Sequence, residues 1–541
     1  MNVGNQSSNT LPTLMISDQS PSSHATSIPS PTASPPTSPS PTASSLSFPP
    51  YVKADIDALL SQIASFDLPS LHSLDISHQD TFPSHGLRQF SQKFPTLKSL
   101  KCSCTRSDLV LIAECFPNLQ EIDVSYPITS VFSDTDLHEK ALASGLKKLR
   151  KVNLSGTYML GNSSIFTCCQ NCVSLEALVV HHTSSLSNVG FANAIRKRPQ
   201  LRSLGVRSGN VTSELIDALV SLKDLTFLDL SFSHISDEAL CALAEGGLPL
   251  REFSLEYCKG YQYSGISCLL RMCNNLQYLD LQETKFLNDE CVIELSLLLG
   301  NLNVVNLNWN EKLTDLSLFA IMRNCPFITE IRMGFTGVGK QKLGGDCLVV
   351  NSHLKFLYLA CNSWLDDGIV TMLASVCPNL EMMDLSHCSK VSMGAIEVLR
   401  RCRKIQHMNL THLGYDPSRS KFWINFKVPT LFVLNLSRSS ISNEELSQIS
   451  KSCCNLKELD LDYCDKITTS GVKQVVNNCK ELRMITLWNC ENVSCDIIDW
   501  MVLTRPWMRE IITPRTSRLS VGERDDFFRH GCCVNWSFEY N

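Results

Sequence analysis

One pattern of apolar positions recurs along most of the chain. An apolar residue, usually leucine, is followed by another three residues later and by a third two residues after that. From Leu225 onward the spacing between these phrases stays within 24 to 26 residues. The phrases begin at Leu71, Leu97, Leu119, Leu149, Leu175, Leu201, Leu225, Leu250, Leu276, Leu302, Ile328, Leu354, Leu380, Ile405, Leu431, Leu456 and Leu482.

Each phrase predicts one strand and one helix. In residues 456–481 the triplet Leu459-Asp460-Leu461 alternates as a strand does. Val472, Val475 and Val476 follow with the spacing of one helical face. A period of this length with this apolar phrase is typical of leucine-rich repeats. We therefore predict an α/β leucine-rich-repeat solenoid, a horseshoe with a parallel concave sheet and convex helices.

The segments before and after the repeats differ in composition. Residues 1–50 hold 14 Ser, 10 Pro and 6 Thr, with Asp18 as the single charged side chain, so we expect a disordered tail. Residues 51–67 are expected to form an N-terminal capping helix, and 68–507 to hold about 17 repeats. Residues 508–541 are expected to add a final strand and a C-terminal cap. Three stretches break the rhythm, within 119–149, 336–350 and 412–429.

The cysteines follow the repeat. Many of the 25 recur either three residues after the third apolar position or three residues before the next phrase, as Cys388 and Cys377 do. We interpret them as small buried side chains in a reducing compartment. With no visible secretory signal, this predicts a cytoplasmic or nuclear protein, or one found in both. No apolar stretch is long enough for a membrane span, so no membrane association is expected.

Composition and motifs argue for binding rather than catalysis. The net charge of −5 is small for 541 residues and no Lys/Arg run appears, so no nucleic-acid partner is expected. No phosphate loop or nucleophile elbow is found, and we predict no enzyme activity and no cofactor. Cys169 and Cys172 form a Cys-x-x-Cys pair without a second pair at ligand spacing, so no metal site is expected.

The candidate binding residues share one repeat position. Alternation points the apolar positions into the core and the second residue after the third apolar position outward, on the concave face. The residues at this position in successive repeats form a column. It includes Glu283, Cys361, Arg438 and Asn489 as well as most of the candidates named below, and Trp488 lies one position earlier in the last repeat. Exposed aromatic clusters often mark interfaces, whereas packing along the turn is the simpler role for the tyrosines. The predicted partner-binding residues are Phe232, Tyr257, Trp309, Phe335, His387, His412, Tyr463 and Trp488.

The repeat rhythm, the cysteine after each strand and the linker Cys377-Pro378-Asn379-Leu380 resemble the cysteine-containing repeats of F-box/leucine-rich-repeat proteins, particularly the plant members. The resemblance covers residues 68–512. It implies a solenoid that recruits a substrate protein to its concave face in an SCF (Skp1–cullin–F-box) ubiquitin ligase acting in protein catabolism. Leu11-Pro12 does not lead into the helices of an F-box, so binding of the Skp1/cullin complex is expected only if an F-box is supplied or cryptic. The alternative is a stand-alone scaffold or competitor without ligase coupling.

Overall fold

The computed structural model describes residues 15–17, 44–48, 56–79, 81–104, 106–126, 145–157, 160–183, 185–341, 349–413, 424–515 and 519–535. The chain divides into two compact units. Unit 1 holds residues 1–250 and 258–261, and unit 2 holds residues 251–257 and 262–541. Both units repeat the same strand-and-helix element.

In unit 1 the strands from β2 to β9 pair in sequence order, all parallel, while β1 lies antiparallel to β2. The strands are β1 Met15–Ser17, β2 Ser45–Ser47, β3 Ser73–Ile76, β4 Ser99–Cys102, β5 Glu121–Asp123, β6 Lys151–Asn153, β7 Ala177–Val180, β8 Ser203–Val206 and β9 Phe227–Asp229. The helices are α1 Ile56–Ile63, α2 Ser84–Lys93, α3 Arg106–Cys115, α5 Asn162–Asn171, α6 Asn188–Ile195, α7 Ser213–Val220 and α8 Asp237–Glu245.

In unit 2 the strands from β10 to β21 also pair in sequence order and in parallel. They are β10 Glu252–Ser254, β11 Tyr278–Asp280, β12 Val304–Asn306, β13 Glu330–Arg332, β14 Phe356–Tyr358, β15 Met382–Asp384, β16 His407–Asn409, β17 Val433–Asn435, β18 Glu458–Asp460, β19 Met484–Thr486, β20 Glu510–Ile512 and β21 Cys533–Asn535. The helices are α9 Tyr263–Met272, α10 Asp289–Ser296, α11 Asp315–Asn324, α12 Asp367–Val376, α13 Met393–Arg401, α14 Asn443–Ser452, α15 Thr469–Asn478, α16 Ile497–Thr504 and α17 Val521–Arg529.

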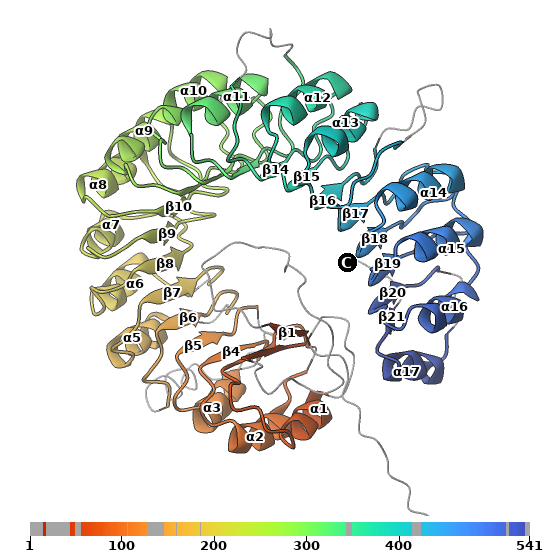
Figure 1. Cartoon of the computed structure of the whole chain (residues 1–541). Coiled ribbons are helices and arrows are strands. Elements are labelled where there is room, and N and C mark those ends of the chain that lie inside the picture. The colour runs from red at the N-terminus through yellow and green to blue at the C-terminus, as the bar shows by residue number, and fades with distance from the viewer. Residues whose placement is uncertain are drawn as a thin grey trace, which may run out of the picture. The chain divides into compact units, whose positions relative to one another are not determined.

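The apolar phrase forms the core of every repeat. Each of the seventeen phrases contains one strand, from β3 to β19. In the repeat of β12 the three apolar positions Leu302, Val305 and Leu307 are at most 2% exposed. Within each unit the strands line one face and the helices the other (Figure 1). The predicted leucine-rich-repeat solenoid is therefore confirmed. Each fully buried aliphatic stabilises it by about 1.5–3 kcal/mol relative to an exposed one.

The helices of neighbouring repeats are joined at their N-termini. Asp367, the first residue of α12, accepts hydrogen bonds from the backbone N–H groups of Ser392 (2.6 Å) and Gly394 (2.7 Å) at the start of α13. A Cβ on Gly394 would lie 3.0 Å from the Asp367 Cα, so glycine permits this close approach. Asp289 likewise accepts from the N–H of Thr314 at 2.8 Å. Each carboxylate thus satisfies helix N–H groups that have no partner within their own helix.

The N-terminal end differs from the sequence-based expectation of a disordered tail through residue 50. Ser45–Ser47 forms β2, which pairs in parallel with β3. Leu46 and Phe48 are each 1% exposed, and the Phe48 N–H bonds to the Asp75 carbonyl at 3.0 Å. The two apolar residues of an otherwise polar segment therefore add one more repeat unit to the stack, which we call a rung. Helix α1 follows β2 in the chain, packs against α2 and serves as the helix of this rung. Met15–Ser17 likewise forms a strand, β1, antiparallel to β2. The rest of the expected tail lies outside the described residues.

The C-terminal end contains the expected final strand, β20, and one more strand beyond it. After β20, helix α17 leads to β21, which pairs with β20 in parallel. The aromatic residues at 536–540 lie outside the described residues. So do the central parts of the three irregular stretches, residues 127–144, 342–348 and 414–423. Among the described residues, none of the helices is both long and apolar enough to cross a membrane.

Candidate functional site

The predicted binding residues occupy a single, unusual backbone position. All eleven residues of the column from Phe232 to Asn489 have positive φ, between 53° and 63°. Tyr126 and His182, each with φ of 53°, and Gly156, with φ of 75°, lie two residues after the third apolar position of earlier repeats. We call these fourteen residues the left-handed column. Sequence reasoning found the register of the column from Phe232 onward but neither its conformation nor the three earlier members.

A backbone ladder explains the left-handed conformation. Trp309 donates its N–H to the Gly334 carbonyl, and Phe335 donates its N–H to the Ala360 carbonyl, both at 2.9 Å. The acceptor in each case is the residue that precedes the next member of the column. The left-handed region costs a non-glycine residue about 1–2 kcal/mol. Glu283, Cys361 and Tyr463 make bonds of the same kind, and each such bond extends the sheet beyond its last strand residue and offsets this cost.

The strand end prepares this turn. In the repeat of β12 the Asn306 side-chain oxygen accepts from the backbone N–H of Asn308 at 3.2 Å. Asp384 does the same for Ser386 at 2.8 Å, and Asp460 for Asp462 at 3.0 Å. Asp and Asn side chains readily bond the backbone two residues onward. The recurring Asp or Asn at the end of the strand therefore starts the turn that ends in the left-handed residue.

The most prominent pair of the column is Trp309 with Phe335. Their rings are stacked, with centroids 3.7 Å apart and planes 9° from parallel. Trp309 is 42% exposed and Phe335 is 38% exposed. Each ring thus gives part of its surface to the other and leaves a large part to solvent. A second pair, His387 and His412, lies with ring centroids 5.0 Å apart, and both residues are exposed.

In unit 1 the side chains around Phe232 form a cluster of aromatic and charged groups. The Phe232 ring lies 5.5 Å from the His182 ring, and the Arg207 guanidinium lies 5.7 Å from the Phe232 centroid. Arg207 also donates to Nδ1 of His182 at 2.7 Å. Burial and the neighbouring charges of Arg207 and His181 lower the pKa of His182. Nδ1 of His182 is an acceptor in this contact, so the imidazole is neutral.

The other predicted residues are less uniform. Tyr463 is 38% exposed and packs against Arg438, whose guanidinium lies 4.2 Å from the ring centroid. Tyr257 is half-buried and donates its N–H to the Gln282 carbonyl at 3.0 Å. Trp488 is half-buried and donates its N–H to Asp462 Oδ1 at 2.8 Å. The predicted set thus contains two ring pairs, Trp309 with Phe335 and His387 with His412. Phe232 and Tyr463 instead contact His182 and Arg438, outside the predicted set, and partner binding by these residues stays a prediction.

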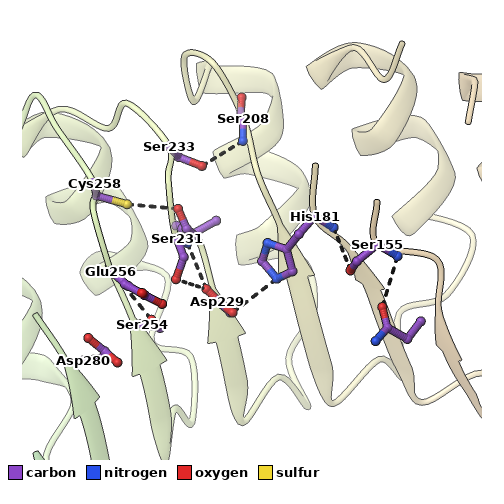
Figure 2. A network of polar contacts seen from close by, with 12 residues as sticks. Ser155, His181, Ser208, Asp229, Ser231, Ser233, Ser254, Glu256, Cys258 and Asp280 are labelled. Atoms are coloured by element: carbon purple, nitrogen blue, oxygen red, sulfur yellow. Dashed lines mark hydrogen bonds and ion pairs between the residues drawn. The ribbon is translucent and has the colours of Figure 1, made fainter. Parts of the chain in front are cut away.

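The solvent-facing side of the sheet carries polar networks that sequence reasoning missed. His181 Nε2 lies 3.2 Å from Asp229 Oδ2, across the intervening strand β8 (Figure 2). A Cβ on Gly205 of β8 would lie 2.7 Å from His181 Nε2, so only glycine leaves room for the contact. Burial opposes ionisation of Asp229, but hydrogen bonds from His181 and Ser231 lower the pKa of the carboxyl. The glycine inside a strand was the available sequence signal.

The repeated cysteines have a structural role. Cys388 Sγ donates to the Leu359 carbonyl at 3.2 Å, and Cys464 Sγ donates to the Leu436 carbonyl at 3.3 Å. Asn362 occupies the same repeat position and donates to the Met333 carbonyl at 2.8 Å. These side chains are therefore hydrogen-bond donors that link rungs, rather than the purely apolar fillers that the sequence suggested.

The Cys-x-x-Cys pair belongs to the same kind of arrangement. Cys172 Sγ donates to the Leu146 carbonyl at 3.3 Å, and burial is the main cause that raises the pKa of Cys169 to about 12. A thiol with so high a pKa is a poor nucleophile and metal ligand, whereas a hydrogen bond from Cys168 lowers the pKa of Cys172. In the part of the chain that the structure describes, no three His, Cys, Asp or Glu residues are grouped to hold a metal ion.

Comparisons with known proteins agree with the fold. A leucine-rich repeat family model matches residues 221–244 and 452–475. F-box/LRR-repeat protein 4 of Bos taurus is 26% identical over 215 residues, covering 39% of this chain and 34% of that protein. GRR1-like protein 1 of Arabidopsis thaliana is 23% identical over 289 residues, covering 47% and 49%. A transport inhibitor response 1-like protein of Oryza sativa subsp. japonica is 24% identical over 348 residues, covering 56% and 61%.

These matches are partial. The chain spans between a third and three fifths of the length of those relatives. The solved structure of the yeast Rad7 and Elc1 complex aligns over 82% of this chain and 84% of that chain, with 16% identity and a TM-score of 0.41. The chain is a leucine-rich-repeat protein with distant similarity to F-box/LRR proteins. Such solenoids are protein-interaction scaffolds and typically have no catalytic role.

Proposed function

We propose that the chain recognises a substrate protein through its left-handed column and delivers it to an SCF E3 ubiquitin ligase. The observation that carries this proposal is the exposed Trp309–Phe335 stack on a hydrogen-bonded backbone. Large aromatic residues are enriched among the residues that dominate binding energy. Because the backbone and the stack already hold both rings in place, little side-chain entropy is lost when a partner covers them.

Partner capture tests the binding half of the proposal. The full chain is expressed with a proximity-labelling enzyme while the proteasome is inhibited, and labelled proteins are compared with those of the double variant Trp309→Ala/Phe335→Ala. We expect a small set of proteins to be lost, because removal of two residues worth ~2 kcal/mol each weakens binding on the order of 10²-fold or more.

A matched control separates this effect from general loss of surface. Trp507 is 43% exposed in unit 2 but lies outside the column, and its Nε1 donates to the Lys480 carbonyl at 2.7 Å. Trp507→Ala should retain the labelled set. An unchanged set in the double variant, with the fold intact, would place the partner site elsewhere in the chain.

Coupling to the ligase is tested separately. Distant similarity to F-box/LRR proteins supports it, and an F-box is the module expected to bind Skp1. Purified chain and a fusion carrying an F-box ahead of residue 51 are each titrated with Skp1. We expect tight binding by the fusion and no sub-micromolar complex with the chain alone. If substrates captured by the fusion are not ubiquitinated in a reconstituted ligase, the chain is a stand-alone scaffold or competitor.

The site of action is proposed to be the cytoplasm, the nucleus or both. The cysteines of the described residues are free thiols, many of them buried donors between rungs. Reducing compartments preserve such thiols. Imaging of a fluorescent fusion checks this proposal, and accumulation in the secretory pathway would contradict it.

A further inference from the structure

Lysines accompany the Trp309–Phe335 stack along the same edge of unit 2. Lys285, Lys312, Lys340 and Lys390 lie on the loops that follow β11, β12, β13 and β15. Each comes two to five residues after a member of the left-handed column, and all four side chains are exposed. Together with Trp309 and Phe335, they form what we call the lysine–aromatic edge.

The ammonium groups of this edge make no ion pair among the described residues. Lys312 Nζ donates to the Lys285 carbonyl at 3.1 Å, and Lys340 Nζ donates to the Glu311 carbonyl at 3.3 Å. Lys390 Nζ lies 4.4 Å from the centroid of the Trp364 ring, which is 48% exposed. An ammonium has three donors. These contacts therefore orient Lys312, Lys340 and Lys390 and leave donors for an incoming acceptor.

Two aspartates of these repeats are committed to the backbone. Asp289 accepts from the N–H of Thr314, and Asp315 accepts from the N–H groups of Gly339 (3.0 Å) and Gln341 (3.2 Å). Cations on the solvent-facing side of the sheet are arranged differently. There Lys355 Nζ lies 3.0 Å from Glu381 Oε1. The lysine–aromatic edge thus presents four lysines without an ion pair among the described residues, on a chain whose net charge is −5.

We propose that the lysine–aromatic edge binds an extended acidic segment of the partner protein, with carboxylates on the lysines and an apolar side chain on the Trp309–Phe335 stack. This inference rests on the proposed partner binding and specifies its chemistry. Successive rungs are about 4.7–4.9 Å apart, so an extended segment running along the edge meets several lysines in turn. Complementary charge provides orientation and a fast association rate.

The charges on the edge favour a protein segment over a nucleic acid. Glu283, a member of the column, and the exposed Glu311 lie among the lysines. These carboxylates would repel the uniform charge of a phosphate backbone. They suit a segment in which acidic residues alternate with other side chains.

Selection of peptides by the full chain tests the proposal. A phage-displayed library of random 16-residue peptides is selected on wild-type chain, and synthetic fluorescent versions of the selected peptides are measured by anisotropy. The variant replaces Lys285, Lys312, Lys340 and Lys390 by Glu. The matched control replaces four exposed lysines elsewhere by Glu: Lys147, Lys223, Lys404 and Lys480.

The expected result has four parts. Selected peptides are enriched in Asp and Glu around an aromatic or aliphatic residue, and their affinity falls at least tenfold in the edge variant but not in the control. Changing their Asp and Glu to Asn and Gln has a similar effect, and added salt weakens binding because it screens the exposed charges. Circular dichroism and thermal melting establish that both variants are folded.

Three outcomes of the peptide and nucleic-acid measurements overturn the inference. One is selection without acidic enrichment, and another is equal peptide affinity in the edge variant and the wild type. The third is tighter binding of a labelled single-stranded 20-nucleotide probe that is lost in the edge variant, which would assign the edge to nucleic acid. If cellular partners depend on Trp309 and Phe335 but not on the lysines, the proposed function stands and this inference fails.

Discussion

The rings of Trp309 and Phe335, which are 26 residues apart in the sequence, lie parallel with centroids 3.7 Å apart. Both keep large exposed surfaces, so they differ from core residues of similar size. We expect Trp309→Ala and Phe335→Ala each to cost little stability, with a coupling of about 0.5–1.5 kcal/mol in a double-mutant cycle. Urea denaturation of the four proteins measures the coupling.

Leu307→Ala is the control for this cycle. Leu307 is 2% exposed in the same repeat, and its truncation should cost about 2–5 kcal/mol. If Trp309→Ala destabilises the chain as much as Leu307→Ala does, the ring is a core element and its assignment to a binding surface is wrong.

The left-handed column reverses the usual ranking of glycine and alanine. Trp309 has φ of 63°, where glycine has no steric penalty and alanine does. Trp309→Gly should therefore be more stable than Trp309→Ala by about 1 kcal/mol. At Gln474, an exposed position of α15, the order should invert by a similar amount, because glycine weakens a helix interior. Chemical denaturation of the four variants compares the two pairs.

The inter-rung donor position should accept asparagine in place of cysteine. Cys388→Asn places an amide where Asn362 already donates to a carbonyl of the preceding rung. Cys388→Ala removes the thiol donor, while the Leu359 carbonyl keeps its hydrogen bond from Asn362 Nδ2 at 2.9 Å. The expected cost is therefore that of one lost hydrogen bond, about 0.5–1.5 kcal/mol. Melting temperatures should therefore rank wild type and the Asn variant above the Ala variant. Equal melting of the Ala variant and wild type would show that the thiol acts only as a filler.

The N-terminal boundary predicts different effects for two deletions. Removal of residues 1–43, which include the three-residue edge strand β1, should change the melting temperature by no more than a degree or two. Removal of 1–50 should lower it by several degrees. The second deletion takes Leu46 and Phe48 from the core, and each contributes about 1.5–3 kcal/mol when buried. Equal melting of the two truncated chains would contradict the role of β2 as a rung.

Glu510 should make stability depend on pH. Burial is the main cause of its high pKa, opposed by a hydrogen bond from Asn535 and reinforced by Glu458, and raises the pKa to about 7. The folded chain then keeps a proton that the unfolded chain releases between its ordinary pKa, near 4.5, and 7. The free energy of unfolding should therefore fall as pH rises through this window.

Glu510→Gln removes this titration and should flatten the fall between pH 5 and pH 8 in urea denaturation. Asp462, whose pKa burial and Asp460 raise to about 6, retains a smaller contribution of the same sign. Identical slopes in the variant and wild type would rule out Glu510 as the source.

Local patterns determined the fold class and the register of the candidate site. The phrase that buries Leu302, Val305 and Leu307 is visible in the sequence because strand alternation and repeat length are local properties. The same register placed Trp309 and Phe335 at one outward position. Leu46 and Phe48 were missed because a two-residue apolar signal within a polar segment becomes a rung only when the next strand is present to pair with it.

Only the tertiary structure decided how side chains from different repeats meet. The left-handed backbone of Trp309 depends on a carbonyl in the next rung, and the contact of His181 with Asp229 crosses a whole strand over Gly205. The thiol of Cys388 has a donor role because a carbonyl of the preceding rung lies within reach. A single sequence shows which residues form the strand, the turn and the helix of each repeat. Contacts between repeats depend on the spacing and twist of the stacked rungs, which packing of the whole array sets.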